Sequence, residues 1–346
     1  NIACHYICSN LINVSAKLDY EIMRKLLAIL FISILVFFSC RPEQKTSIIK
    51  VGLTHGKSHS FSQALEHFSQ CLEEKSNGRL KVKIFHSSQI GSEKEMQEML
   101  TIGSLDICLS GILNTYEPLF TLFELPYLYK NREHAIKVNT GPIMREVASS
   151  LEDNGIVLIG FYENGFRNIS TSNKAVNHPS DLVGLKIRTP ENPAQIQTIR
   201  ALGGIPTPLS FSELYTALIQ GVVDGQENPL QNIWFGRLYE SQKFIAKTQH
   251  IYNSLYITAS KRLWGSLDAN DQQLILDCIN QSSMWQLEYM KKLDMELEEK
   301  MKREGVTFTY PDKEEFAAAT EPAYEEMYKI LGENARRIVQ AIRNID

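Results

Sequence analysis

Apolar residues follow two rhythms in the first part of the patterned chain. Residues 48–53 are a short run of β-formers. Over residues 61–72 the apolar side chains recur at three- and four-residue steps, which predicts a helix that ends at Asn77-Gly78. Apolar residues then alternate with lysines over residues 80–84, and this period of two predicts a strand.

A second helix and a third strand follow. Ser92, with Glu95 three residues later, has the pattern of a capping box that begins a helix. Gly103 ends this helix, and residues 105–109 are predicted to form a strand. The order strand, helix, strand, helix, strand implies a parallel sheet with right-handed crossovers. The fold class is therefore α/β.

The same organisation recurs further along the chain. Two strand-like runs and a short helical run come first, at residues 155–161, 184–188 and 196–202. A second capping box, Ser210 with Glu213, begins a helix that stops at Gly221, and residues 222–224 are predicted to be a strand. Two lobes built alike explain the recurrence economically, although glycine is common at helix–strand junctions in general.

Residues 267–304 contain neither glycine nor proline and carry apolar residues at helical spacing. One helix of this length would approach about 55 Å, longer than a small lobe is wide. It would act as a strut shared by two lobes, and the alternative is two helices with a break between them. A last helix is predicted over residues 321–344.

The apolar run Leu26–Phe38 precedes all of these elements. As a helix it would rise about 20 Å, too little to cross a hydrocarbon core of roughly 30 Å. A signal peptide at residues 23–39 is the better interpretation. Because Met23-Arg24-Lys25 has the form of a signal-peptide start, residues 1–22 are expected to come from an over-extended gene prediction.

Cys40, directly after Ser39, resembles a bacterial lipoprotein cleavage site, at which the thiol receives a lipid. Residues 40–47 would then be the lipidated cysteine and a linker. The match is imperfect, because Phe37 and Phe38 stand where leucine and a small residue are usual. Cleavage near Ser39 without lipidation is the alternative.

Composition and charge narrow the class of protein. A length of 346 residues suits about two domains, and 43% hydrophobic with 22% charged residues fits a globular protein. The net charge of −4, without a long run of one sign, excludes the clustered basic face of a nucleic-acid-binding protein. Cys71, Cys108 and Cys278 do not make a disulfide framework, so buried free thiols are expected.

No strong catalytic or cofactor signature is present: there is no glycine-rich phosphate loop, no G-x-S-x-G and no C-x-x-C. His55 and His59 stand four residues apart, and no carboxylate completes a zinc site nearby. We therefore expect no metal and no cofactor. His59 as part of the lining of a polar cleft is the favoured interpretation.

Two segments place polar side chains at strand ends. Arg188 closes a strand before Pro190, and residues 223–229 follow another strand. In open α/β sheets ligands bind at the carboxyl ends of strands, and the arginine fork matches a carboxylate with two hydrogen bonds. An isolated arginine at a strand end is more often in a surface ion pair, so the pattern alone leaves both interpretations open.

From about Ile49 to its end, the chain resembles the DctP-type solute-binding proteins of tripartite ATP-independent periplasmic (TRAP) transporters. The resemblance rests on LPYLY at 125–129, GFR at 165–167, DLVGLKIRTP at 181–190 and ALGGIPTPLSFSELYTALIQGVVDGQENP at 201–229. Gly204 is a small departure, since alanine is commoner there. The resemblance implies a two-lobed periplasmic-binding-protein fold with a long helix spanning both lobes.

The resemblance also implies the lobe boundaries. Lobe I would comprise residues 48–163 and 254–293, and lobe II residues 164–253 and 294–346. The chain would cross between the lobes near Glu163, Ser254 and Leu293, and the lobes would close on the ligand by a hinge motion.

Site residues carry over in the same way. Arg188 corresponds to the carboxylate clamp, Asn228 to its hydrogen-bonding companion and Arg167 to a second cationic contact. Phe211 corresponds to an aromatic wall, with core packing as the alternative. Glu93 corresponds to an acidic residue of the other lobe that meets ligand hydroxyls, with a helix-start charge as the alternative.

The implied function is transport. A polyhydroxylated acid such as a uronate or aldonate would suit the polar residues Glu93, Glu191, Asn192 and Asn228. A C4-dicarboxylate, with Arg167 on its second carboxylate, is the alternative. The protein would be lipid-anchored in the periplasm and deliver the acid to a TRAP membrane permease. A lipoprotein that presents its ligand to a sensor kinase would use the same clamp. An enzyme is disfavoured, because only Glu93 and His59 could act as a base.

Overall fold

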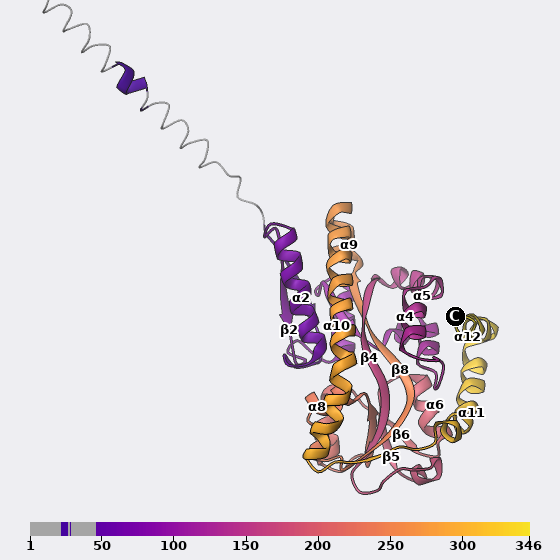
Figure 1. Ribbon diagram of the computed structural model, residues 1–346. Helices are drawn as coiled ribbons and strands as arrows, with labels where there is room; N and C mark the ends of the chain where they lie inside the picture. The colour runs from indigo at the N-terminus through magenta and orange to yellow at the C-terminus, as the bar shows by residue number, and fades with distance from the viewer. Residues whose placement is uncertain (1–21, 27, 29–45) are drawn as a thin grey trace, which may run out of the picture. The chain divides into compact units, whose positions relative to one another are not determined.

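The computed structural model describes residues 22–26, 28 and 46–346 (Figure 1). The chain divides into two units, residues 1–46 and 47–346, and the elements below all belong to the second. Residues 22–26 and 28 are helical. The predicted cleavage site and Cys40 lie outside the described residues. Within those residues, no helix combines the length and the hydrophobicity needed to cross a bilayer.

The first half of the sheet confirms the predicted order. It contains β1 (Ser47–Gly52), α2 (Ser60–Lys75), β2 (Leu80–Phe85), α3 (Glu93–Thr101) and β3 (Ile107–Ser110). Strand β1 pairs in parallel with both β2 and β3. The capping box of α3 is also present: Ser92 Oγ accepts from the Glu95 amide, and Glu95 Oε2 accepts from the Ser92 amide at 2.7 Å.

Two long antiparallel strands join this half to the rest of the sheet. They are β4 (Ile156–Thr171) and β8 (Phe244–Ser260), and Figure 1 shows them curving side by side through the molecule. The strand order is β2-β1-β3-β8-β4-β7-β5-β6, and β9 (Thr307–Thr309) pairs with β8. The predicted parallel sheet is therefore mixed, because β4 and β8 run antiparallel to each other.

The second half of the sheet has parallel strands β5 (Lys186–Thr189), β6 (Ile205–Pro208) and β7 (Gly225–Asn228). Its helices are α6 (Pro193–Ala201), α7 (Phe211–Ile219) and α8 (Leu230–Phe235). The strand predicted at residues 222–224 is wrong: these residues form a bend, and β7 begins at Gly225. Val222 and Val223 are residues typical of a strand, but here they form the connection from α7 back to the sheet.

One detail supports the recurrence seen in the sequence. Asp106 Oδ2 accepts from the Lys50 amide of the neighbouring parallel strand at 2.8 Å. Asp224 Oδ2 accepts from the Lys186 amide, also at 2.8 Å. The two Gly-x-x-Asp segments thus make the same contact in the two halves of the sheet.

The predicted strut is one helix, α10 (Ala269–Arg303), of 35 residues. Ile275 and Ile279 pack into the apolar core beside α2, whereas Met290 and Leu297 pack into the core beside α8. The alternative of two helices with a break is wrong. Helix α10 contacts both halves of the sheet.

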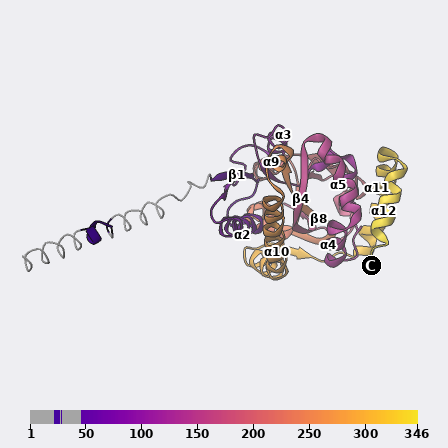
Figure 2. The same ribbon diagram turned by 90° about the horizontal axis from the view of Figure 1, so that it is seen from above.

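The single C-terminal helix predicted over residues 321–344 is wrong. The chain forms α11 (Lys313–Leu331) and α12 (Glu333–Arg343), separated by Gly332 at φ 77°. Helix α11 packs on α6, whereas α12 packs on α5 (Pro142–Ala148), as Figures 1 and 2 show. The C-terminal segment therefore packs on helices from two separate parts of the chain.

The remaining regular elements are short. Two α-helices complete the set, α4 (Arg132–Thr140) and α9 (Lys261–Ser266). Five 3-10 turns occur in the described chain, at Leu113–Thr115, Pro118–Glu124, Ser149–Asn154, Pro179–Leu182 and Leu238–Glu240.

The cysteines correct another expectation. Cys71 of α2 and Cys278 of α10 form a disulfide across 207 residues of sequence, with Cα atoms 5.7 Å apart. They were expected to be free, but the two helices pack against each other and bring them together. Cys108 of β3 is the buried free thiol that was expected.

Candidate functional site

A small cavity of about 50 Å³ lies between residues of the two halves of the sheet. Glu93 and Glu124 line it from the first half, and Arg188 and Asn228 line it from the second. A wider outer pocket of about 640 Å³ shares Glu93, Arg188 and Phe211 with it. The sheet thus brings together side chains that are far apart in the sequence.

Arg188 is a buried cation in β5. Its Nε and Nη2 both donate to the Leu209 carbonyl oxygen, at 3.0 and 2.7 Å. It forms no ion pair with any carboxylate of residues 46–346. Burial and then the neighbouring Arg167 lower its pKa to about 10, against the opposing effect of Glu227, Glu93 and Glu191, so it stays charged at neutral pH. A buried guanidinium that makes no ion pair within the protein favours an anion in the cavity.

Arg167 of β4 is equally buried but already paired. Its Nε donates to Glu227 Oε2 at 2.5 Å, and its Nη2 donates to Glu227 Oε1 at 2.8 Å. Nη1 reaches Asn253 Oδ1 at 3.4 Å. Burial alone would raise the pKa of Glu227, but Arg167, and then His250, hold it below its usual range. The charge of Arg167 is therefore balanced within the protein.

Asn228 lies at the end of β7, and hydrogen bonds to two neighbouring side chains fix the orientation of its amide. Its Oδ1 accepts from Asn232 Nδ2 at 2.9 Å, and its Nδ2 donates to Gln226 Oε1 at 2.5 Å. Asn232 Oδ1 lies 2.9 Å from His59 Nε2. His59 Nδ1 accepts from the Phe61 amide at the start of α2, so the neutral ring carries its proton on Nε2.

This series of hydrogen bonds fixes which way the side-chain amide of Asn228 is oriented. Burial lowers the pKa of His59 to about 3, so the ring stays neutral and donates to Asn232. Asn232 must then donate to Asn228, and one N–H of Asn228 remains available to the cavity. His59 does not line the cavity, although it was expected to, but forms a hydrogen bond to Asn232, which does. The histidine in the cavity wall is His55.

Glu93 is the first residue of α3 and also lines the cavity. Its Oε1 accepts from Ser110 Oγ at 2.9 Å and from the Gly111 amide at 2.5 Å. Burial raises its pKa, and these hydrogen bonds and Arg188 oppose the rise. The position at a helix start and the position in the wall are therefore compatible.

Phe211 and Glu191 lie at the wider, outer pocket. The Phe211 ring stacks on His55 at 4.9 Å between centroids and also packs against the core beside α8. Wall and core packing thus coexist at this residue. The Glu191 carbonyl accepts from Asn114 Nδ2 at 3.4 Å, and Asn192 caps α6 through the Ala194 amide.

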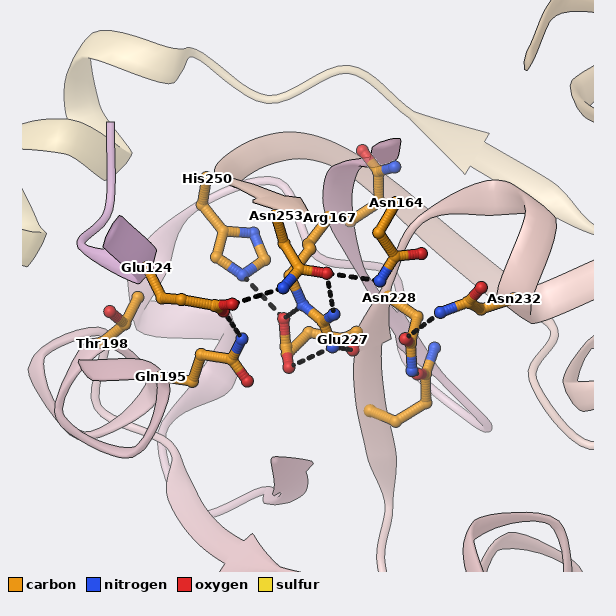
Figure 3. A network of polar contacts seen from close by, with 12 residues as sticks. Glu124, Asn164, Arg167, Gln195, Thr198, Glu227, Asn228, Asn232, His250 and Asn253 are labelled. Carbon is orange, nitrogen blue, oxygen red and sulfur yellow. Dashed lines mark hydrogen bonds and ion pairs between the residues drawn. The ribbon is translucent and has the colours of Figure 1, made fainter. Parts of the chain in front are cut away.

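A network of buried polar residues, drawn in Figure 3, was not predicted from the sequence. Glu124, in the turn before LPYLY, accepts from Gln195 Nε2 and from Asn253 Nδ2. Asn253 Oδ1 in turn accepts from Asn164 Nδ2. Burial raises the pKa of Glu124 to about 7, against the effect of Arg167. A carboxylate inside the apolar run Leu122–Leu128 was the available signal.

Two groups of side chains meet at the cavity. We name Arg188, Glu93 and Phe211 the Arg188 corner. Arg167, Glu227, Glu124, Gln195 and Asn253 form the Arg167 corner. Among the described residues, no group of three His, Cys, Asp or Glu side chains is arranged to hold a metal ion.

Comparison with known families gives a match over most of the chain. The model of DctP, the bacterial extracellular solute-binding protein family 7, matches residues 51–330. The C4-dicarboxylate-binding periplasmic protein DctP of Rhodobacter capsulatus is 32% identical over 79% of this chain and 84% of its own length.

Two solved structures of TRAP periplasmic solute-binding proteins are similar to most of this chain. One, from Polaromonas sp. JS666 with bound D-erythronate, is 30% identical with a TM-score of 0.83, over 87% of this chain and 99% of its own. The other, from Roseobacter denitrificans OCh 114 with bound L-galactonate, is 28% identical with a TM-score of 0.81, over 86% and 99%.

Proposed function

Because the chain belongs to family 7 of the bacterial extracellular solute-binding proteins, we propose that it captures a sugar acid for a TRAP transporter. The observation that carries the proposal is Arg188, a buried cation without a carboxylate partner among residues 46–346, in the wall of a cavity between the two halves of the sheet. The carboxylate of the ligand would complete this pair, with Asn228 as a second donor.

The distribution of charge favours a polyhydroxylated monocarboxylate. Arg167 forms an ion pair with Glu227, whereas Arg188 forms none among residues 46–346, so one arginine of the cavity and not two is open to a ligand carboxylate. Glu93 only accepts hydrogen bonds when ionised and suits hydroxyl groups. Relatives with D-erythronate and L-galactonate support an aldonate or uronate. A C4-dicarboxylate, bound by the Rhodobacter relative, is the second candidate.

Closure would complete the site. In the proposed division, lobe I comprises residues 48–163 and 254–293, and lobe II comprises residues 164–253 and 294–346. Strands β4 and β8 carry two of the crossings, and α10 carries the third near Leu293. Excluding water from the cavity strengthens the charge-assisted pair, and a ligand of micromolar affinity releases about 8 kcal/mol.

Location and partners follow from the same proposal. The protein would be exported by the signal peptide, anchored by lipid on Cys40 in the periplasm, and would deliver its ligand to the TRAP membrane permease. Cys40→Ser should abolish incorporation of labelled palmitate and release the protein in soluble form. Unchanged labelling would contradict the anchor. A sensor role would instead require a receptor kinase that binds the closed form.

Direct binding tests the function. The mature protein should be screened by thermal shift against sugar acids and dicarboxylates, because a ligand at one hundred times its dissociation constant adds about 2.7 kcal/mol of stability. Hits should then be measured by calorimetry, with NMR of the recovered ligand to detect turnover. Absence of binding to every acid would contradict the proposal, and chemical conversion of the ligand would favour an enzyme.

A further inference from the structure

The C-terminal segment of the chain is anchored in two different cores. Near the start of α11, Phe316 is buried in a core whose other members lie within residues 169–246, all of proposed lobe II. Glu315 Oε2 lies 2.9 Å from Nδ1 of His178, which belongs to the same stretch. The beginning of α11 is therefore attached to lobe II.

The rest of the segment belongs to another core, which is formed mainly by residues 96–161 of proposed lobe I. His134 Nε2 lies 2.9 Å from the Ile342 carbonyl oxygen, and Arg337 of α12 pairs with Glu146 of α5. Figure 1 accordingly shows α11 beside α6, and α12 beside α4 and α5. Six apolar side chains of α11 and α12 are buried in this core: Tyr324, Met327, Ala335, Ile338, Val339 and Ile342.

The size of this apolar contact decides how it behaves when the lobes open and close. If residues 324–346 moved with lobe II, opening would separate the six side chains from their core and expose them to water. This exposure would cost more free energy than a ligand of micromolar affinity releases. The contact with lobe I is therefore expected to persist in both the open and the closed state.

Helix α11 has a weak point between its two anchors. Pro322 lies inside the helix, between Phe316 and Tyr324. Proline has no N–H to donate to the Ala318 carbonyl oxygen, and its ring presses against that carbonyl, so a helix bends more easily there. The weak point thus coincides with the place where the chain passes from one core to the other.

We infer that α11 and α12 form a fourth connection between the lobes, a strap whose start moves with lobe II and whose residues 324–346 move with lobe I, with bending at Pro322. This inference rests on the proposed function and its hinge closure, and it revises the proposed division, which placed residues 294–346 in lobe II. The strap limits how far the lobes separate, because each of its ends stays in its own core.

Distances between pairs of spin labels, measured by electron paramagnetic resonance, test which lobe each end follows. Cys108 is buried and the other two cysteines of the folded unit form the disulfide, so introduced cysteines take the label in the mature protein with Cys40→Ser. The labelled positions are exposed and lie on α2, α7, α11 and α12: Lys75→Cys, Thr216→Cys, Glu314→Cys and Gln340→Cys.

Saturating L-galactonate, the acid bound by a relative, should change the distance between Lys75 and Thr216 as the lobes close. If another acid of the screen binds more tightly, it takes the place of L-galactonate. The distance from Gln340 to Lys75 and that from Glu314 to Thr216 should stay constant, whereas that from Gln340 to Thr216 should change. A Gln340 label that instead keeps its distance to Thr216 and moves relative to Lys75 would overturn the inference.

Pro322→Ala tests the bend. Alanine restores the hydrogen bond to Ala318 and stiffens α11 in the unbroken form seen here, in which Arg188 is 2% exposed and the cleft around it is closed. The dissociation rate of every bound acid, measured by stopped flow, should therefore fall by about threefold or more, because opening must now bend an intact helix.

Pro142→Ala is the matched control. Pro142 occupies the first turn of α5, where alanine restores no hydrogen bond of the helix, so the dissociation rate should not change. Equal rates in Pro322→Ala and the unaltered protein, or an equal fall in both variants, would overturn the inference while leaving the sugar-acid function intact. Failure of the unaltered protein to bind any acid of the screen would overturn the proposed function instead.

Discussion

Arg188 and Arg167 belong to one sheet, are both 2% exposed and both line the same small cavity. Glu227 neutralises Arg167 through two carboxylate contacts, and the pair fixes β4 against β7. Arg188 contacts a backbone carbonyl instead and retains its full charge. Arg167, whose anion is supplied by the protein, thus stabilises the fold. Arg188, which has no such partner among residues 46–346, is available to bind a ligand anion.

The largest expected effect concerns the balanced pair. Glu227→Gln would leave Arg167 buried without a counter-charge, which costs on the order of 3–5 kcal/mol. Unfolding in urea measures the loss, and Glu325→Gln, in an exposed ion pair with Arg336, should cost only about 0–1 kcal/mol. Equal small losses in both variants would contradict the structural role of the Arg167 corner.

The same variant has a predicted pH signature. The pKa of Glu227 lies below its usual range in the folded protein. The ionised Glu227 therefore makes its full contribution to the free energy of unfolding when the pH is above the unfolded pKa of about 4.3. It is lost as pH falls through the lower folded pKa. Glu227→Gln should therefore lose less stability than the unaltered protein on acidification below pH 4.

The next largest expected effect is on ligand affinity and concerns Arg188. Arg188→Lys should weaken sugar-acid binding well over tenfold, because a point ammonium cannot replace a two-pronged contact in a dry site. Calorimetry measures the change, and Arg200→Lys, on the exposed side of α6, is the control. Near-normal affinity in Arg188→Lys would remove Arg188 from the binding site.

Glu93 tests the surroundings of Arg188. Glu93→Gln should lose affinity for sugar acids, by about 1.5–3 kcal/mol for one hydrogen bond to a charged group. Dicarboxylates should lose less or gain, because a repulsive charge has been removed. Equal affinities in the variant and the unaltered protein for both classes would mean that Glu93 serves only as a helix-start charge.

The smallest expected effect lies behind Asn228. His59→Asn retains a side chain that caps α2 but is too short to reach Asn232. Freed from this constraint, Asn228 can turn its oxygen to the ligand, and affinity for L-galactonate should fall two- to fivefold, about 0.5–1 kcal/mol. The neutral carboxamide of the same acid should lose less. Equal losses for both ligands would indicate a general change in packing.

Local signals in the sequence predicted about half of the helices and strands, and the long strand β8 was not among them. Capping boxes at Ser92 and Ser210 begin their helices as expected, because the partners lie three residues apart. The break at Gly332 was missed, because residues on both sides continue an apolar helical pattern. The Cys71–Cys278 pair depends on how two helices pack, which spacing along the chain does not report.

The candidate site divides in the same way. Arg188, Asn228 and Glu93 come from segments with specific motifs, and the structure brings all three to one cavity. Glu124 and Gln195 carry no motif, and their contact exists only after distant segments have met. The sequence could therefore indicate which residues line the cavity, but not how the amide side chains there are oriented.

The disulfide between α2 and α10 has a mechanical consequence. Cys278 lies near the start of the 35-residue helix, so the first turns of α10 are fastened to the first half of the sheet, while its far end packs beside α8. The disulfide prevents α10 from sliding along α2, but it does not restrain the part of α10 beyond Cys278 from bending. If the two proposed lobes move as rigid bodies, we expect the disulfide to oppose translation along α10, so that closure would proceed by rotation.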